Sequence, residues 1–392
     1  MRFFHLSDLH IGKQLHYYSL QENQRAVLSQ IAEKAREYRP DAILICGDIF
    51  DHAVPSGESY MVFDKFLQEL SAITPGIPVL VIAGNHDNAR RLGYASSFLE
   101  KHQIYLSVSA PTQQEEHLKK VVLSDEYGDV NFYLLPFLKP GYVRHLFAEG
   151  AVTDYESAVR EVLAREEIDY RQRNVLLSHQ FYTNHGQAPE RCESEQLAVS
   201  LGGLENVDVS VIAEFDYAAL GHIHGAQMVK SPHIRYCGTP LKYSVSEEHH
   251  KKSITMVTLG AKGEGSVIET IPLIPIQDVR RERGLLQEII GKAREDNRHD
   301  FLSVTLTDEK EPYHPKEQLE EVYDAVLEVR IDNTRTRNRI SEQQDEDFSM
   351  QPMELFCAFY QEMQGQPMTA EEEALVEEIL VEEIVDRRGD EK

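Results

Sequence analysis

AILICGDIFD, residues 42–51, is the stretch that decides the fold of this chain. Its first half is an apolar run with the length of a buried strand, and its second half places Asp48 and Asp51 where that strand would end. Four other segments have the same arrangement: FFHLSDLH at 3–10, VLVIAGNHD at 79–87, VLLSH at 175–179 and YAALGHIH at 217–224. Ligands bind at the carboxyl ends of strands in open α/β sheets, so the five segments together predict one site.

The five strand ends carry seven side chains of the metal-ligand type, which are Asp8, His10, Asp48, Asn85, His179, His222 and His224. Oxygen and imidazole ligands without thiolate suit Mn²⁺, Fe²⁺ or Zn²⁺. Seven ligands exceed one tetrahedral zinc site, but they suit two ions if one carboxylate is shared, and Asp48 is the natural bridge. Two ions about 3.5–4 Å apart can activate water and stabilise in-line displacement at phosphorus. The set therefore predicts phosphoester hydrolysis.

His86 is not needed as a ligand, because Asn85 directly before it fills that role. It is free to donate a proton to the leaving oxygen, and we expect Asp87 to orient its ring. The simpler interpretation of any single motif is a satisfied polar pair or an ordinary turn. The series of five motifs, in this order, favours the two-metal interpretation.

Apolar residues recur at helical spacing in 21–38 and 60–70, between the first three strands. Strands separated by helices pair in parallel, with the helices on the faces of the sheet. Short apolar stretches then follow as far as residue 259. We therefore expect an α/β fold, a layered sandwich of two sheets flanked by helices.

These motifs resemble those of the calcineurin-like metallophosphoesterases over residues 1–260. The resemblance implies a first metal held by Asp8, His10, Asp48 and His224, and a second held by Asp48, Asn85, His179 and His222. It also implies that His86 is the catalytic histidine. In related nucleases the residue matching His52 helps to place the scissile phosphate, although an ordinary loop histidine is the alternative.

Four further segments resemble the bacterial SbcD family of nuclease subunits, and the resemblance then covers all 392 residues: HQF at 179–181, SE at 194–195, YCGTPLKYS at 236–244 and KKS at 251–253. Cys237 and Thr239 stand where that family often has serines. The resemblance implies a Mn²⁺-dependent DNA exonuclease and hairpin endonuclease for DNA repair and recombination. It also implies a homodimer that forms a heterotetramer with the ATPase SbcC.

Prolines at 272 and 275 predict a domain boundary after residue 270. The expected domains are a nuclease domain at 1–270, a small α/β capping domain at 271–332, a linker at 333–350 and a helical tail at 351–392. In the tail, Thr369 and Glu372 predict a capping box. The two amphipathic tail helices fit a partner groove, and the resemblance implies the coiled-coil base of SbcC. Arg280, Arg281 and Arg283 could contact phosphate, but salt bridges on a solvated surface are the favoured interpretation.

The net charge of −26 disfavours strong binding of DNA by this chain alone. Half of that charge lies in 341–392, which has 16 acidic and 3 basic residues. We expect a partner to supply much of the DNA affinity. The four scattered cysteines and the lack of a leader or of an apolar run of ~20 residues predict a cytoplasmic protein. The resemblance to DNA nucleases implies that it is nucleoid-associated.

Two other functions share parts of this pattern. A phosphatase or phosphodiesterase for small molecules or phosphoproteins would have the same ligands, but it leaves the capping domain and the acidic tail without a purpose. An interaction scaffold would need neither the complete ligand set nor His86. The DNA nuclease therefore remains the favoured function.

Overall fold

The computed structural model describes residues 1–195 and 205–337, together with a few residues between 353 and 376. It divides into two compact units. The first comprises Met1–Arg281, Arg294–Ser303 and Tyr323–Leu327, and the second comprises Glu282–Ala293, Val304–Val322 and the chain from Glu328. Most of the expected linker and tail lies outside the described residues.

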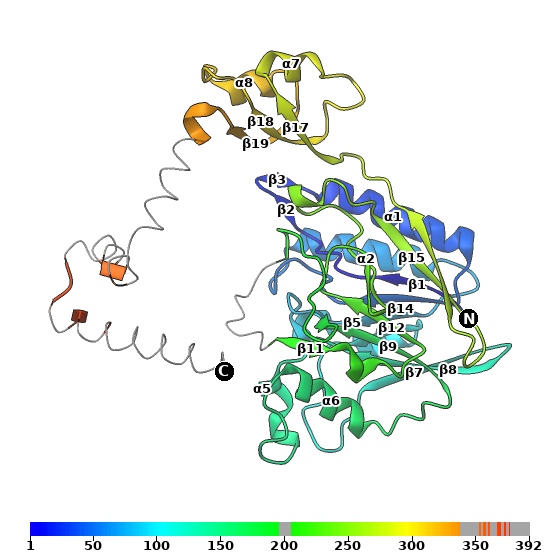
Figure 1. The fold of residues 1–392 in the computed structure, drawn as a ribbon. Helices are drawn as coiled ribbons and strands as arrows, with labels where there is room; N and C mark the ends of the chain where they lie inside the picture. Colours follow the sequence, from blue (N-terminus) through cyan, green and yellow to red (C-terminus); the bar gives the residue numbers. More distant parts are fainter. Residues whose placement is uncertain are drawn as a thin grey trace. The chain divides into compact units, whose positions relative to one another are not determined.

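The first unit contains a six-stranded sheet built around the N-terminal strand (Figure 1). Its order is β16 (Ser266–Pro272), β15 (Ser253–Leu259), β1 (Arg2–Leu6), β4 (Ala42–Cys46), β5 (Val79–Ile82) and β6 (Ile104–Ser107). Strands β1, β4, β5 and β6 are parallel, because α1 (Gln21–Tyr38) and α2 (Gly57–Ser71) connect the first three. Strand β15 pairs antiparallel with β1.

A second six-stranded sheet faces the first. Its order is β13 (Gln227–Val229), β14 (Ser231–Tyr236), β12 (Tyr217–Gly221), β9 (Arg173–His179), β8 (Gly128–Leu135) and β7 (Lys119–Asp125). The four inner strands are parallel, and the edge strands β7 and β13 are antiparallel. The antiparallel edge strands were not expected. Only Glu126–Tyr127 connects β7 to β8, and so short a connection can join only antiparallel strands.

Three apolar clusters hold these layers together. Consecutive residues of β1, such as Phe3 and Phe4, point to opposite faces, and both are fully buried. Phe4 packs with α1 and α2, whereas Phe3 packs with Phe132 and Tyr217 of the second sheet. The outer face of the second sheet packs on α6 (Tyr155–Arg165). The layers are helices, sheet, sheet and helices, so the predicted sandwich is confirmed.

Shorter elements complete the first unit. They are β2 (Gln14–Leu15), β3 (Tyr18–Ser19), α3 (Ala89–Leu92), α4 (Ser96–Glu100), α5 (Pro140–Val143), β10 (Phe181–Thr183), β11 (Asn206–Asp208) and the 3₁₀ turns η1 (Arg144–Leu146), η2 (Val209–Ile212) and η3 (Val245–Glu247). No helix of the described residues is long and apolar enough to cross a membrane.

Towards the C-terminus lies a three-stranded sheet in the order β17 (Val279–Gly284), β18 (Phe301–Leu306) and β19 (Ala325–Ile331), with α7 (Leu286–Gly291) and α8 (Pro315–Glu320). Strand β19 begins at Ala325 and buries Val326.

Side chains of the described residues also test two smaller predictions. Arg280, Arg281 and Arg283 pair with Asp300, Glu248 and Asp332, as the salt-bridge alternative predicted. Thr369 and Glu372 form the predicted capping box, since the Thr369 N–H donates to the Glu372 carboxylate (2.8 Å) and the Glu372 N–H to the Thr369 hydroxyl (3.4 Å).

Candidate metal centre

The ends of β1, β4 and β5 meet those of β9 and β12 at one edge of the two sheets. Asp8, His10 and Asp48 adopt positive φ there, of 52°, 42° and 49°. This left-handed conformation is found mainly at Asn, Asp and His among non-glycine residues. Backbone bonds from Asp8 N to Gly47 O (3.0 Å) and from His10 N to Asp48 O (2.9 Å) tie the two loops together. The backbone thus turns the side chains of both strands toward one point.

Two glycines let the loops approach this closely. A Cβ on Gly47 would overlap the ring of His179, and a Cβ on Gly84 would overlap the carboxylate of Asp48. Gly47 also has a φ of +90°, which L side chains rarely adopt. The Gly-Asp and Gly-Asn pairs of the sequence are therefore steric requirements of the site.

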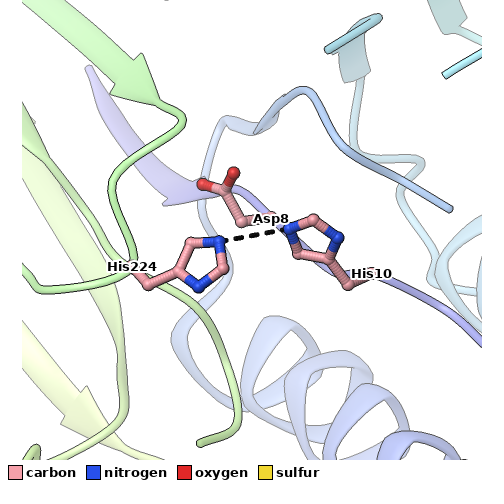
Figure 2. Close-up of side chains that lie close together, drawn as sticks. All are labelled: Asp8, His10 and His224. Carbon is pink, nitrogen blue, oxygen red and sulfur yellow. Dashed lines mark hydrogen bonds between the residues drawn. The ribbon is translucent and has the colours of Figure 1, made fainter. Parts of the chain in front are cut away.

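One cluster of ligand atoms comes from Asp8, His10 and His224 (Figure 2). The Nε2 atoms of His10 and His224 lie 3.2 Å apart, and the rings point toward each other beside the Asp8 carboxylate. All three residues are buried. Burial, and then the nearby His10, hold the pKa of His224 well below its usual range, so its Nε2 lone pair is available to a cation.

A second cluster lies beside the first and shares one oxygen with it. The Oδ2 atom of Asp48 is 3.6 Å from His10 Nε2 and 3.4 Å from His179 Nε2. His179 Nε2 and His222 Nδ1 both approach Asn85 Oδ1, at 3.0 and 2.9 Å. All seven predicted ligand residues therefore gather at one place, in two groups on either side of Asp48.

The charges of this cluster fit divalent cations. Although burial disfavours the imidazolium, the charges of Asp48 and Asp8 raise the pKa of His179 to about 9. A divalent cation would take the place of that proton, since metal ligation needs neutral imidazole. The donor set has oxygen and nitrogen but no sulfur, and a single carboxylate oxygen lies between the two groups. These residues fit a pair of divalent ions.

His86 sits at the edge of this cluster. Its Nδ1 lies 2.8 Å from the carbonyl oxygen of Asp51 and donates to it, which leaves Nε2 facing Asp48 Oδ2 at 4.0 Å. The expectation that Asp87 orients this ring is wrong. The Asp87 carboxylate instead accepts three backbone N–H groups, from Ile49 (3.1 Å), Phe50 (3.0 Å) and Gly84 (2.9 Å), and so fixes the β4 loop to the β5 loop.

His52 and Asp51 lie at the outer end of the cluster. The side chain of His52 is 73% exposed, with Nε2 at 3.3 Å from Asp51 Oδ2. Asp51 also approaches His10 Nδ1 (3.3 Å) and Lys13 Nζ (2.8 Å). Asp51 therefore contacts the proposed metal ligand His10 through the Nδ1 atom of its ring. The Gly-Asp-x-x-Asp spacing could have indicated this role for Asp51.

A chain of side chains that runs from the half-buried Ser194 to the buried Glu247 and Lys252 fixes the ring of His224. Ser194 Oγ donates to Glu247 Oε1 (2.6 Å), so its oxygen must accept from His224 Nδ1 (2.7 Å). That bond leaves Nε2 unprotonated toward His10. Lys252 Nζ lies 2.6 Å from the fully buried Glu247 and is itself only 7% exposed. Ser194 of the Ser-Glu segment and Lys252 of the Lys-Lys-Ser segment thus both contact Glu247, and Ser194 also contacts the proposed ligand His224. The sequence alone did not indicate this arrangement.

Comparisons with known proteins agree with this site. Residues 1–226 match the family model described as Calcineurin-like phosphoesterase, and residues 275–364 match the Type 5 capsule protein repressor C-terminal domain. The chain is 27% identical to the SbcD subunit of the SbcCD nuclease of Staphylococcus epidermidis, over 99% of this chain and 100% of the relative. Identity to the SbcD subunit from Staphylococcus saprophyticus is also 27%, over 97% and 98%.

Among solved structures, a dimetal phosphatase from Danio rerio is similar with a TM-score of 0.40 and 14% identity, over 70% of this chain and 97% of that one. The family assignment rests on the sequence model, which covers more than half of this chain and contains all seven predicted ligands. The chain therefore belongs to the calcineurin-like phosphoesterase family, whose members are metal-dependent phosphoester hydrolases.

Proposed function

We propose that this chain is the nuclease subunit of an SbcCD-type complex and hydrolyses DNA phosphodiester bonds with two Mn²⁺ ions. The observation that carries the proposal is the single oxygen of Asp48 between two groups of ligands, with His86 beside it. Relatives named as this subunit cover nearly the whole chain and support DNA as the substrate. The proposed activities are double-strand exonuclease and single-strand or hairpin endonuclease.

The proposed ligands are those named from the sequence, with Asp48 shared between Asp8, His10 and His224 on one side and Asn85, His179 and His222 on the other. Divalent ions bound there would supply Lewis-acid stabilisation of the phosphate charge and a more acidic water. The protein's own contribution is to orient these side chains. Cys46 O accepts from His179 Nδ1 (2.8 Å), so Nε2 is the nitrogen that faces Asn85.

His86 is proposed to move the proton. Because Nδ1 is held by the Asp51 carbonyl, only Nε2 can face the substrate. As water adds to phosphorus, it releases one proton to solvent. As the bond from phosphorus to the leaving oxygen breaks, the Nε2–H of the imidazolium protonates that oxygen, and the ring then takes up a proton from solvent.

Five further proposals stay as the sequence suggested them. The domain boundaries are 1–270, 271–332, 333–350 and 351–392, and the last segment would bind the coiled-coil base of SbcC. Two copies of this chain would dimerise within a heterotetramer. The complex would act in the cytoplasm, at the nucleoid. His52 would help to place the scissile phosphate.

The test of the proposed function is a substrate panel for the purified full chain with Mn²⁺. Hairpin DNA, duplex DNA and bis-p-nitrophenyl phosphate are compared, with and without SbcC and ATP, and bound metal is counted. We expect two ions per chain and cleavage of all three substrates. Hydrolysis of the small diester alone, under every condition, would exclude DNA as the substrate.

His86→Gln is expected to lower the turnover of DNA by about a hundredfold, because the leaving oxygen loses its proton donor. Two bound metals should remain, since His86 is not a proposed ligand. His117→Gln, an equally sized change at a 60% exposed histidine paired with Glu166, is the control and should have no effect. Wild-type turnover in His86→Gln would remove this residue from the mechanism.

Ser194→Ala is expected to weaken Mn²⁺ binding about 10- to 100-fold, because His224 loses the acceptor that fixes its tautomer. Isothermal titration calorimetry measures the effect without any substrate. Ser124→Ala is the matched control, since it also removes a 2.6 Å hydroxyl–carboxylate bond, with Asp129, but in the hairpin of β7 and β8. Equal affinities in the two variants would show that Ser194 does not support the ligand.

A further inference from the structure

An unbroken row of ring contacts runs through the second group of ligands. His179 and His222 lie in its middle, with ring centroids 5.3 Å apart. Phe137 packs edge-on against His179, and Phe181 packs edge-on against His222, each with a centroid distance of 6.3 Å. The two phenylalanines therefore flank the centre.

Each end of this row carries a cation. Lys139 Nζ lies 5.8 Å from the centroid of the Phe137 ring, and Arg191 Cζ lies 4.1 Å from that of Phe181. Both charged side chains are exposed. Within 1–195 and 205–337, neither Lys139 nor Arg191 forms an ion pair with a carboxylate. Cation–π contact favours this placement of a long charged side chain without neutralising its charge.

Each cation also lines a cavity that reaches a proposed ligand. One cavity, of about 310 Å³, is lined by Lys139, Phe137 and Asn85 among others. The other, of about 280 Å³, is lined by Arg191, His250 and His224 among others. The two cavities share no lining residue, and each reaches a ligand of a different group, Asn85 in one and His224 in the other.

We propose that Lys139 and Arg191 bind phosphate groups of the substrate strand, one on each side of the phosphate that is cut. This inference rests on the proposed DNA substrate. In a chain with a net charge of −26, two unneutralised cations next to the metal centre are well placed to attract a polyanion locally. The phenylalanine rings contact both cations without neutralising them. A substrate with a single phosphate has no flanking phosphate for either cation to bind.

The experiment compares Lys139→Gln, Arg191→Gln and the double variant of the full chain with Mn²⁺. Each single change is expected to lower kcat/KM on a single-stranded oligonucleotide about fivefold at low salt. It should also reduce the slope of log affinity against log salt by about 0.7, the contribution of one phosphate contact on a single strand. Hydrolysis of bis-p-nitrophenyl phosphate should stay at the wild-type rate.

Lys120→Gln is the matched control. Lys120 is also an exposed cation over an aromatic ring, 5.8 Å from the centroid of Tyr133, but it lies in the edge strand β7. It should leave every rate unchanged. If the wild type cuts DNA and all variants share its rate and salt slope, the inference alone is wrong. If the wild type cuts only the small diester and binds no oligonucleotide, the DNA substrate and the inference both fail.

Discussion

Replacing Asp48 with asparagine is expected to lower kcat/KM on DNA at least about a thousandfold, which corresponds to roughly 4 kcal/mol of lost transition-state stabilisation. The Oδ2 atom of Asp48 is within 3.6 Å of ligand nitrogens in both groups, so one substitution affects both proposed metal positions. A neutral amide offers one oxygen and no charge, whereas two divalent ions need an anionic bridge.

Metal binding gives a readout of Asp48→Asn that does not depend on activity. Saturating Mn²⁺ should stabilise the wild-type fold by about 2.7 kcal/mol at a hundred times the Kd. The asparagine variant should lose most of that gain in a thermal melt, while its metal-free fold persists. Asp64→Asn, at an exposed position of α2, is the control. Two ions bound with wild-type affinity in Asp48→Asn would contradict a shared oxygen.

Much of the centre was predictable because each ligand follows a strand directly. The carboxyl ends of parallel neighbours meet at one sheet edge, so Asp8, Asp48 and Asn85 had to lie close together once β1, β4 and β5 were recognised. His179 and His222 follow from the same rule in the second sheet. The two sheet edges face each other because of how the sheets pack. The spacing of apolar residues in the sequence does not determine that packing.

The side chains behind the ligands were not predictable from local patterns. Ser194 and Glu247 are 53 residues apart, and Glu247 lies in a 3₁₀ turn rather than at a strand end. Asp87 shows the opposite error, because its place beside His86 in the sequence suggested a ring contact. The backbone turn directs its carboxylate to three N–H groups instead. Tertiary packing decides such contacts.

Glu247→Gln is expected to lower the free energy of unfolding by about 3–5 kcal/mol, because it leaves the charge of Lys252 buried without a counter-ion. Glu247 is fully buried, and its carboxylate lies 2.6 Å from Lys252 Nζ. The glutamine fills the same space and its one oxygen can still accept from Ser194, Ser244 and the Tyr243 N–H, so no cavity accounts for the loss. Its amide NH2 instead faces the Lys252 ammonium, donor against donor. Few surface substitutions reach this size.

Urea unfolding of the metal-free chain measures this effect, followed by circular dichroism because the chain has no tryptophan. Glu37→Gln is the control: its pair with Lys34 has the same charge types at 2.8 Å but is exposed, so a loss below about 1 kcal/mol is expected. Adding Lys252→Met to Glu247→Gln should recover part of the stability, because the stranded charge is then gone. If the losses in stability from Glu247→Gln and Lys252→Met are instead independent and additive, the ion pair does not couple these residues. The support for His224 would then come from packing alone.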